Sequence, residues 1–177
     1  MSKKILIIGN GAKEYALAKK LSEKHEVYVT PSSDTLKEFT ICLDIREDNV
    51  AELLEFVMEN GIDMTIPISA QALKSNIAEI FNNNGQKIFA PAQKASNIVF
   101  DKALAKKVLY KLRIPTPKFG IFEKQNMVLD YIKNQKIPFL LKTDASNSAA
   151  IFTSYQTAKP AVDLSLIHIS EPTRRTP

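Results

Sequence analysis

The stretch Lys4-Ile-Leu-Ile-Ile8-Gly9-Asn10-Gly11 decides the predicted fold. Its apolar run is continuous rather than alternating, which is typical of a parallel strand buried on both faces. The glycines that follow predict a tight turn into a helix over residues 12–23, where apolar residues recur at helical spacing. A strand, a glycine turn and a helix in this order predict the start of a βαβ unit.

The alternation of strands and helices continues through the first half of the chain. Short apolar runs predict strands, and the longer stretches between them predict helices. The predicted strands are residues 4–8, 26–29, 39–43, 63–66 and 87–89, and the predicted helices are residues 12–23, 47–60 and 70–84. This pattern predicts an α/β fold, with a Rossmann-like open parallel sheet over residues 1–92.

The pattern changes after Phe89. We expect a domain boundary near residues 92–100, a helical linker over residues 93–117 and a short, incomplete second subdomain over residues 118–163. The elements predicted there are two helices within residues 93–112 with a break near Phe100 and Asp101, an extended Pro-containing connector at 113–117, a strand at 118–122, a helix at 124–134 and a strand at 137–142.

The composition is that of an ordinary folded protein. Of 177 residues, 45% are hydrophobic and 24% are charged, which excludes disorder for most of the chain. The net charge of +5 is spread along the sequence, so no nucleic-acid partner is expected. No apolar run approaches the ~20 residues that span a bilayer, and no signal-peptide pattern opens the chain, so no membrane partner is expected. Because Cys42 is the single cysteine, we expect a reducing, cytoplasmic location.

The turn Gly9-Asn10-Gly11 is the strongest candidate for a binding site. Glycines at such a turn let backbone N–H groups approach a phosphate closely. The dinucleotide fingerprint G-x-G-x-x-G is not completed, because Glu14 stands at its last position, and Thr30 rather than an acidic residue follows the second predicted strand. Two alternatives stay open: a tight turn with a purely structural role, and a phosphate or sugar site without a dinucleotide.

Residues 9–16, Gly-Asn-Gly-Ala-Lys-Glu-Tyr-Ala, resemble the opening motif G-N-G-G-R-E-H-A of the glycinamide ribonucleotide synthetase (phosphoribosylamine–glycine ligase) family. Other stretches resemble later motifs of this family, in the same order and spacing over residues 3–145. They are residues 61–66 (G-I-D-M-T-I), 85–91 (G-Q-K-I-F-A-P), 101–106 (D-K-A-L-A-K), 113–116 (R-I-P-T) and 139–144 (F-L-L-K-T-D). Each stretch is weak alone, but their shared register points to the family.

The resemblance implies a fold and a reaction. The fold is a Rossmann-like pre-ATP-grasp domain followed by the truncated start of an ATP-grasp module. The reaction is the ATP-dependent ligation of glycine to phosphoribosylamine through an acyl phosphate, in de novo purine biosynthesis. The implied cofactors are ATP and magnesium, with the metal ligands expected beyond this chain. No catalytic residue is assigned within it, and the chain alone is not expected to catalyse the ligation.

The resemblance also implies two sets of binding residues. The turn and first helix would contact the phosphoribosylamine substrate through Gly9, Asn10, Gly11, Lys13 and Glu14. Lys102 and Lys142 correspond to two lysines that contact ATP phosphates in ATP-grasp enzymes. Their pattern alone is more typical of ordinary surface lysines.

Several departures from the family motifs favour an alternative. Lys13 and Tyr15 stand where the family has Arg and His, and Ser69 stands in the stretch where the family motif G-P-E has its acidic residue. Residues 145–150 contain none of the glycines of the family's phosphate-covering loop. The alternative is a degenerate, non-catalytic paralogue that binds a nucleotide, a sugar phosphate or a protein partner.

The last residues match no part of the family. Residues 164–174 resemble the translation of a transposase adapter used in sequencing libraries, and the prolines and threonines of residues 172–177 favour irregular chain. We expect residues 164–177 to be an irregular, non-native tail, and the gene to continue past Asp163.

Overall fold

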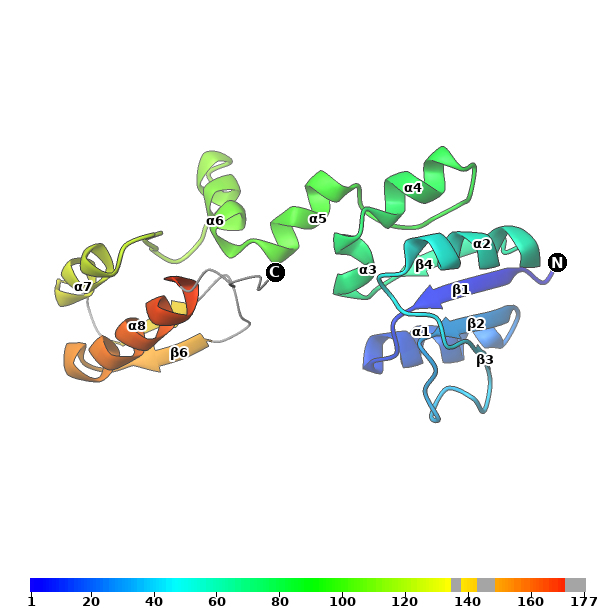
Figure 1. Ribbon diagram of the computed structural model, residues 1–177, viewed down its shortest axis with the longest axis horizontal. Helices are drawn as coiled ribbons and strands as arrows, with labels where there is room; N and C mark the ends of the chain where they lie inside the picture. The colour runs from blue at the N-terminus through cyan, green and yellow to red at the C-terminus, as the bar shows by residue number, and fades with distance from the viewer. Residues whose placement is uncertain (135–137, 143–148, 171–177) are drawn as a thin grey trace, which may run out of the picture. The chain divides into compact units, whose positions relative to one another are not determined.

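The computed structural model describes residues 1–134, 138–142 and 149–170, with side chains up to residue 162. The chain divides into two compact units, Met1–Phe100 and Asp101–Pro177 (Figure 1).

The first unit is built on a four-stranded parallel sheet with the order β3-β2-β1-β4. Its strands are β1 (Lys4–Ile8), β2 (Glu26–Thr30), β3 (Ile41–Cys42) and β4 (Met64–Pro67). The Rossmann-like parallel sheet is therefore confirmed. The predicted fifth strand, residues 87–89, is reduced to one parallel bridge between Thr65 and Ile88.

The helices of this unit are α1 (Ala12–Ser22), α2 (Val50–Asn60), α3 (Ala70–Lys74), α4 (Ile77–Asn83) and α5 (Gln93–Phe100). Two predictions need correction. The helix predicted from residue 47 begins at Val50, because the Asn49 side chain accepts a hydrogen bond from the Glu52 N–H and caps it. The helix predicted over residues 70–84 is broken at Asn76, whose φ of 57° is left-handed.

The core of the first unit covers both faces of the sheet. Leu6 and Ile8 of β1 belong to one buried cluster, together with Phe81 of α4. The intervening residues Ile5 and Ile7 belong to a second cluster on the α1 side. Because successive side chains of a strand point to opposite faces, this alternation explains why the whole β1 run is apolar.

Helix α5 packs on the first unit, although it was expected in the linker. The Gln93 N–H donates to Glu79 Oε1 at 2.7 Å, and Gln93 Oε1 accepts from the Asn76 N–H at 3.1 Å. At the other end of α5, Lys74 Nζ lies 5.1 Å from the centre of the Phe100 ring. The break predicted near Phe100 is confirmed, since α5 ends at this residue.

Limited proteolysis tests this division of the chain. We expect a protected fragment that ends between residues 100 and 118, because the contacts of α5 shield it while the following connector is exposed. Mass spectrometry of the fragments gives the cut sites. First cleavage within residues 47–66 or within α5 would contradict the division.

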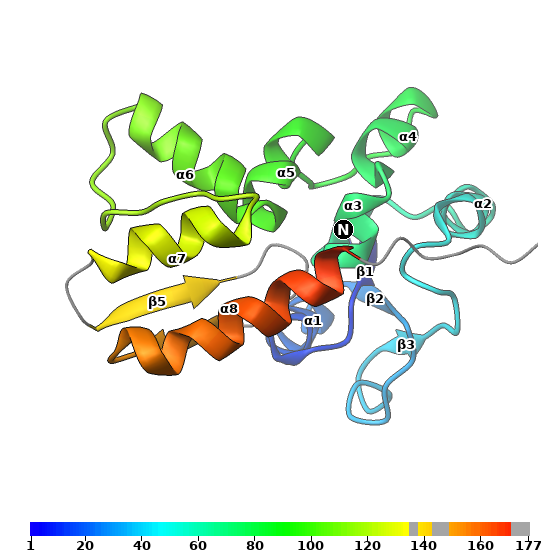
Figure 2. The same ribbon diagram turned by 60° about the vertical axis from the view of Figure 1, so that its left-hand side comes forward.

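The second unit contains α6 (Lys102–Lys111), α7 (Gln125–Lys133), β5 (Phe139–Lys142), β6 (Ala149–Phe152) and α8 (Tyr155–Ser170). The two strands pair antiparallel, with Phe139 opposite Phe152. Helices α7 and α8 lie beside this small sheet and share a buried cluster of Val128, Ile132, Ala158 and Val162 (Figure 2). None of the described helices has the length and apolar character needed to cross a membrane.

Three predictions for the second unit are wrong or incomplete. Residues 118–122 form no strand, and the Phe122 ring instead packs on Tyr131 with ring centres 4.8 Å apart. Strand β6 and helix α8 were not predicted. The backbone of residues 164–170, predicted as irregular, continues α8 to Ser170, while residues 171–177 lie outside the described residues.

Candidate functional site

The carboxyl ends of the parallel strands meet at one edge of the first unit. Gly9-Asn10-Gly11 follows β1, Pro31 follows β2, and Ser69 closely follows β4. The chain runs from β1 through β2 to β3 on one side, and then crosses from β3 to β4 on the other side of β1, so the strand order reverses beside β1. Ligands of open α/β sheets bind outside the carboxyl ends at such a switch point.

The glycine turn is shaped around the side chain of Glu14. Gly9 has a φ of +126° and donates its N–H to the Thr30 carbonyl at 2.7 Å. A Cβ added at Gly9 would lie 2.8 Å from Glu14 Oε1, and one added at Gly11 would lie 2.9 Å from Glu14 Oε2. Gly9 is therefore needed for the close approach of this side chain, whose Cγ would also lie 2.9 Å from the added Cβ, whereas at Gly11 only the end of the Glu14 side chain would have to shift. The turn thus has a structural role.

Glu14 is itself an unusual group for this position. Its side chain folds back from the third residue of α1, and the residue is only 4% exposed. Within the described part of the chain, Glu14 Oε2 has no hydrogen-bond partner. A buried carboxylate beside the turn repels a phosphate and favours a ligand group that donates hydrogen bonds, such as an amine or a hydroxyl.

The five residues predicted to bind substrate thus fall into two groups, those packed against one another and those exposed to solvent. Gly9, Gly11 and Glu14 are in close contact with one another. Asn10 and Lys13 are exposed at the same turn. Their binding roles stay predictions.

A cavity of about 280 Å³ lies at the same edge and is lined by Pro31, Arg46, Glu47, Asp48 and Gln71. Arg46 and Asp48 form a two-pronged ion pair, with Nε to Oδ1 at 3.0 Å and Nη2 to Oδ2 at 2.8 Å. The hydrogen bonds from the guanidinium lower the pKa of Asp48, and those to the carboxylate raise the pKa of Arg46.

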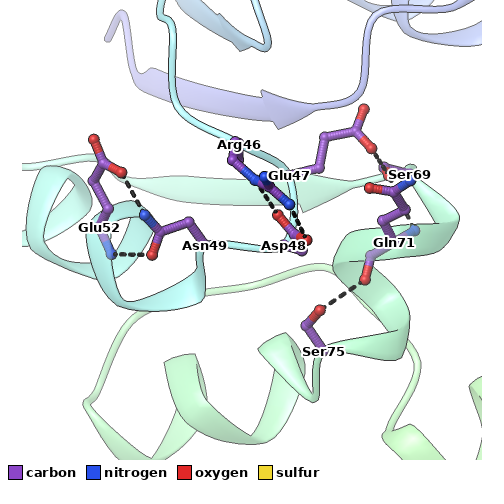
Figure 3. Close-up of polar contacts among 8 residues, drawn as sticks. All are labelled: Arg46, Glu47, Asp48, Asn49, Glu52, Ser69, Gln71 and Ser75. Atoms are coloured by element: carbon purple, nitrogen blue, oxygen red, sulfur yellow. Dashed lines mark hydrogen bonds and ion pairs between the residues drawn. The ribbon is translucent and has the colours of Figure 1, made fainter. Parts of the chain in front are cut away.

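Glu47 and Ser69 come together at this cavity from different loops. The Ser69 hydroxyl donates to Glu47 Oε2 (Figure 3). The sequence did not single out Glu47, because this residue was placed inside the predicted helix over residues 47–60. The signal that could have found the pair is that the loops after β3 and β4 both begin at the carboxyl edge.

The two lysines predicted to bind ATP lie in the second unit. Lys102 is the first residue of α6, whose capping residue Asp101 accepts from the Leu104 N–H at 2.7 Å. Lys142 is the exposed last residue of β5. Cationic side chains at a helix N-terminus and a strand end suit phosphate oxygens chemically.

The rest of the predicted nucleotide region is only partly described. Of the loop at residues 145–150, residues 145–148 lie outside the described residues, and Ala149 and Ala150 belong to β6. Among the side chains that are described, no three His, Cys, Asp or Glu residues are grouped so that they could hold a metal ion.

Residues 3–98 match the family described as phosphoribosylglycinamide synthetase, N domain. The chain belongs to this family. It is 30% identical over 167 residues to the phosphoribosylamine–glycine ligase of Caldanaerobacter subterraneus, a match that covers 91% of this chain and 40% of that protein. The ligase of Streptococcus suis is 34% identical over 146 residues, which covers 80% of this chain and 34% of that protein. The chain thus spans at most about 40% of the length of these relatives.

Solved structures show the fold of this family member. The phosphoribosylamine–glycine ligase of Thermotoga maritima matches with a TM-score of 0.69 and 17% identity, over 89% of this chain and 38% of that one. Thermus thermophilus N5-carboxyaminoimidazole ribonucleotide synthetase matches with a TM-score of 0.69 and 19% identity, over 90% of this chain and 43% of that one. Biotin carboxylase of Campylobacter jejuni, solved as a β,γ-ATP complex, matches with a TM-score of 0.68 and 18% identity, over 96% of this chain and 43% of that one. These ATP-grasp neighbours confirm the predicted fold class.

Proposed function

We propose that this chain is the amino-terminal part of a cytoplasmic phosphoribosylamine–glycine ligase of de novo purine biosynthesis. Its partners are then small molecules: glycine, phosphoribosylamine and ATP. The observation that carries the proposal is the family match over residues 3–98, which includes the whole glycine turn and its Glu14 contact. The names of the curated relatives support the same activity.

We assign the binding of phosphoribosylamine to the first unit. Phosphoribosylamine carries an amine, ribose hydroxyls and a phosphate, so it offers both hydrogen-bond donors and an anion. The buried Glu14 carboxylate suits the donors, and the exposed Lys13 suits the anion. This division assigns complementary roles to the two charged residues of the turn.

We assign the binding of the ATP phosphates to two lysines of the second unit. Lys102 and Lys142 would hold phosphate oxygens of ATP through charge-assisted hydrogen bonds. ATP would transfer its phosphoryl group to the glycine carboxylate, which would give an acyl phosphate and ADP, and magnesium would supply positive charge at the phosphates. The ligands of the metal are expected beyond this chain.

A chimeric enzyme tests the proposed reaction. Residues 1–142 would replace the aligned segment of the Caldanaerobacter ligase, and ADP release would be measured with and without glycine and phosphoribosylamine. We expect release that depends on both substrates, and a fall of about tenfold or more in kcat/KM for Glu14→Gln, since a hydrogen bond to a charged group contributes ~1.5–3 kcal/mol.

The matched control is Glu55→Gln, which removes an exposed carboxylate from α2 and should leave the rate unchanged. A folded chimera that binds ATP but releases no ADP in the presence of both substrates would contradict the proposal. That outcome would favour the alternative of a non-catalytic paralogue.

A further inference from the structure

We propose that Glu47 is a substrate-binding residue of the first unit, whose carboxylate accepts hydrogen bonds from the hydroxyl or amine groups of a ribose 5-phosphate derivative. This inference rests on the proposed function, because that function supplies the class of ligand. It goes beyond the proposed function because Glu47 lies outside every stretch that resembles a family motif.

The Glu47 carboxylate is held in place from a second element of the sheet edge. Ser69, which follows β4, donates its hydroxyl to Glu47 Oε2. The same Ser69 oxygen accepts the Gln71 N–H at 3.2 Å. A serine hydroxyl has one proton, and here that proton is donated to Glu47 while the oxygen accepts the Gln71 N–H. The carboxylate is therefore oriented before any ligand arrives.

The second oxygen of this carboxylate is available to a ligand. Within the described residues, Glu47 Oε1 has no hydrogen-bond partner, and the residue is half-buried at the cavity wall. A carboxylate oxygen accepts hydrogen bonds and donates none at neutral pH. The group that fills this place must therefore carry an O–H or N–H.

The charges around the cavity select the same kind of ligand. Its lining has two carboxylates, from Glu47 and Asp48, against the one guanidinium of Arg46. The two carboxylates disfavour an anion next to Glu47, whereas hydroxyl and amine groups find acceptors there. The volume of about 280 Å³ is close to the lower end of ligand pockets, ~300 Å³, which suits a single sugar ring.

Arg46 is the residue of this cavity that can bind the phosphate of such a ligand. The side chains of Arg46 and Asp48 are 81% and 38% exposed, and exposed ion pairs contribute little to stability. The guanidinium can therefore exchange Asp48 for a phosphate, which it binds with the same two-pronged geometry. A ribose 5-phosphate derivative can thus place its hydroxyl or amine groups at Glu47 and its phosphate at Arg46.

The position of Glu47 also agrees with a departure seen in the sequence. The family motif G-P-E has an acidic residue in the stretch where this chain has Ser69. The structure brings a carboxylate to that serine from the loop before α2 (Figure 3). A carboxylate therefore lies next to Ser69 at this edge of the sheet.

Calorimetric titration of the full chain with ribose 5-phosphate tests the inference. We expect Glu47→Gln to weaken binding by about tenfold or more, because it removes the charge from the acceptor while keeping its size. Glu55→Gln, which changes the net charge equally on an exposed face of α2, should bind as the wild-type chain does. Binding of inorganic phosphate should not weaken in Glu47→Gln, and melting temperatures show whether each variant is folded.

A second experiment exchanges the two residues of the pair, Glu47 and Ser69. The double variant Glu47→Ser/Ser69→Glu returns a carboxylate and a hydroxyl to the same pair of positions, and we expect it to recover binding to within about threefold of wild type. If Glu47→Gln bound ribose 5-phosphate as tightly as the wild-type chain, or if a folded double variant did not recover binding, the role of Glu47 would be overturned. The proposed function would not be affected by either result. Absence of ribose 5-phosphate binding by the wild-type chain would overturn the proposed function as well.

Discussion

Replacing Gly9 by alanine is expected to destabilise the first unit by about 3 kcal/mol, from two sources of comparable size. The φ of +126° strains any residue with a Cβ, at a cost of ~1–3 kcal/mol. The added Cβ would also lie 2.8 Å from Glu14 Oε1 and 2.9 Å from Glu14 Cγ, an overpacking of a buried side chain that costs ~1–3 kcal/mol. Hydrogen exchange of the β1 amides measures the free energy of unfolding of this unit.

Matched variants separate the two sources. Gly85→Ala has the strain alone, since its φ is +70° and no atom lies within 4 Å of the added Cβ, so it should cost about 1 kcal/mol. Gly11 has an ordinary φ of −86°, so Gly11→Ala should cost stability only while Glu14 is present. Equal effects of Gly11→Ala with and without Glu14→Ala would contradict the close packing of Glu14 on the turn.

Phe81→Ala is expected to cost about 3–5 kcal/mol, the range for truncating a buried phenylalanine. Phe81 is fully buried on α4 and packs in the same cluster as Leu6 and Ile8 of the central strand. A unit of this size has ~5–15 kcal/mol of stability in total, so the variant should lower its melting temperature by more than about 10 °C.

Phe89→Ala is the control with the same change of side chain. Phe89 is 75% exposed, so its truncation should change the free energy of unfolding by less than about 0.5 kcal/mol. If both variants lost the same stability, Phe81 would not be the residue that anchors α4 to the sheet.

Both predictions concern the sheet that the sequence identified best. The continuous apolar run of β1 and the glycines after it are local signals, and the fold needs no distant partner to reveal them. The strands predicted around residues 26–29 and 63–66 were confirmed for the same reason. The predicted helix boundaries were less accurate than the predicted strands. Asn49, which caps α2, and the left-handed Asn76 each end or begin a helix through a local backbone geometry that the spacing of apolar residues does not reveal.

Elements that depend on a partner were the ones that the sequence missed. Strand β6 is defined by its pairing with β5, and Ala158 and Val162 of α8 are buried in a cluster with residues of α7 and the small sheet. Residues 118–122 carry a strand-like composition, yet Phe122 packs on Tyr131 instead of joining a sheet. Tertiary contacts override local propensity in such short segments.

In the candidate site, too, local sequence motifs predicted some features and tertiary contacts decided others. The sequence by itself determined the family, the parallel sheet and the glycine turn, because these are written in contiguous motifs and in the spacing of apolar residues. Only the tertiary structure decided what faces the turn and the sheet edge. Glu14 folds back over two glycines, and Glu47 meets a serine 22 residues away, because parallel strands deliver the loops that follow them to one edge.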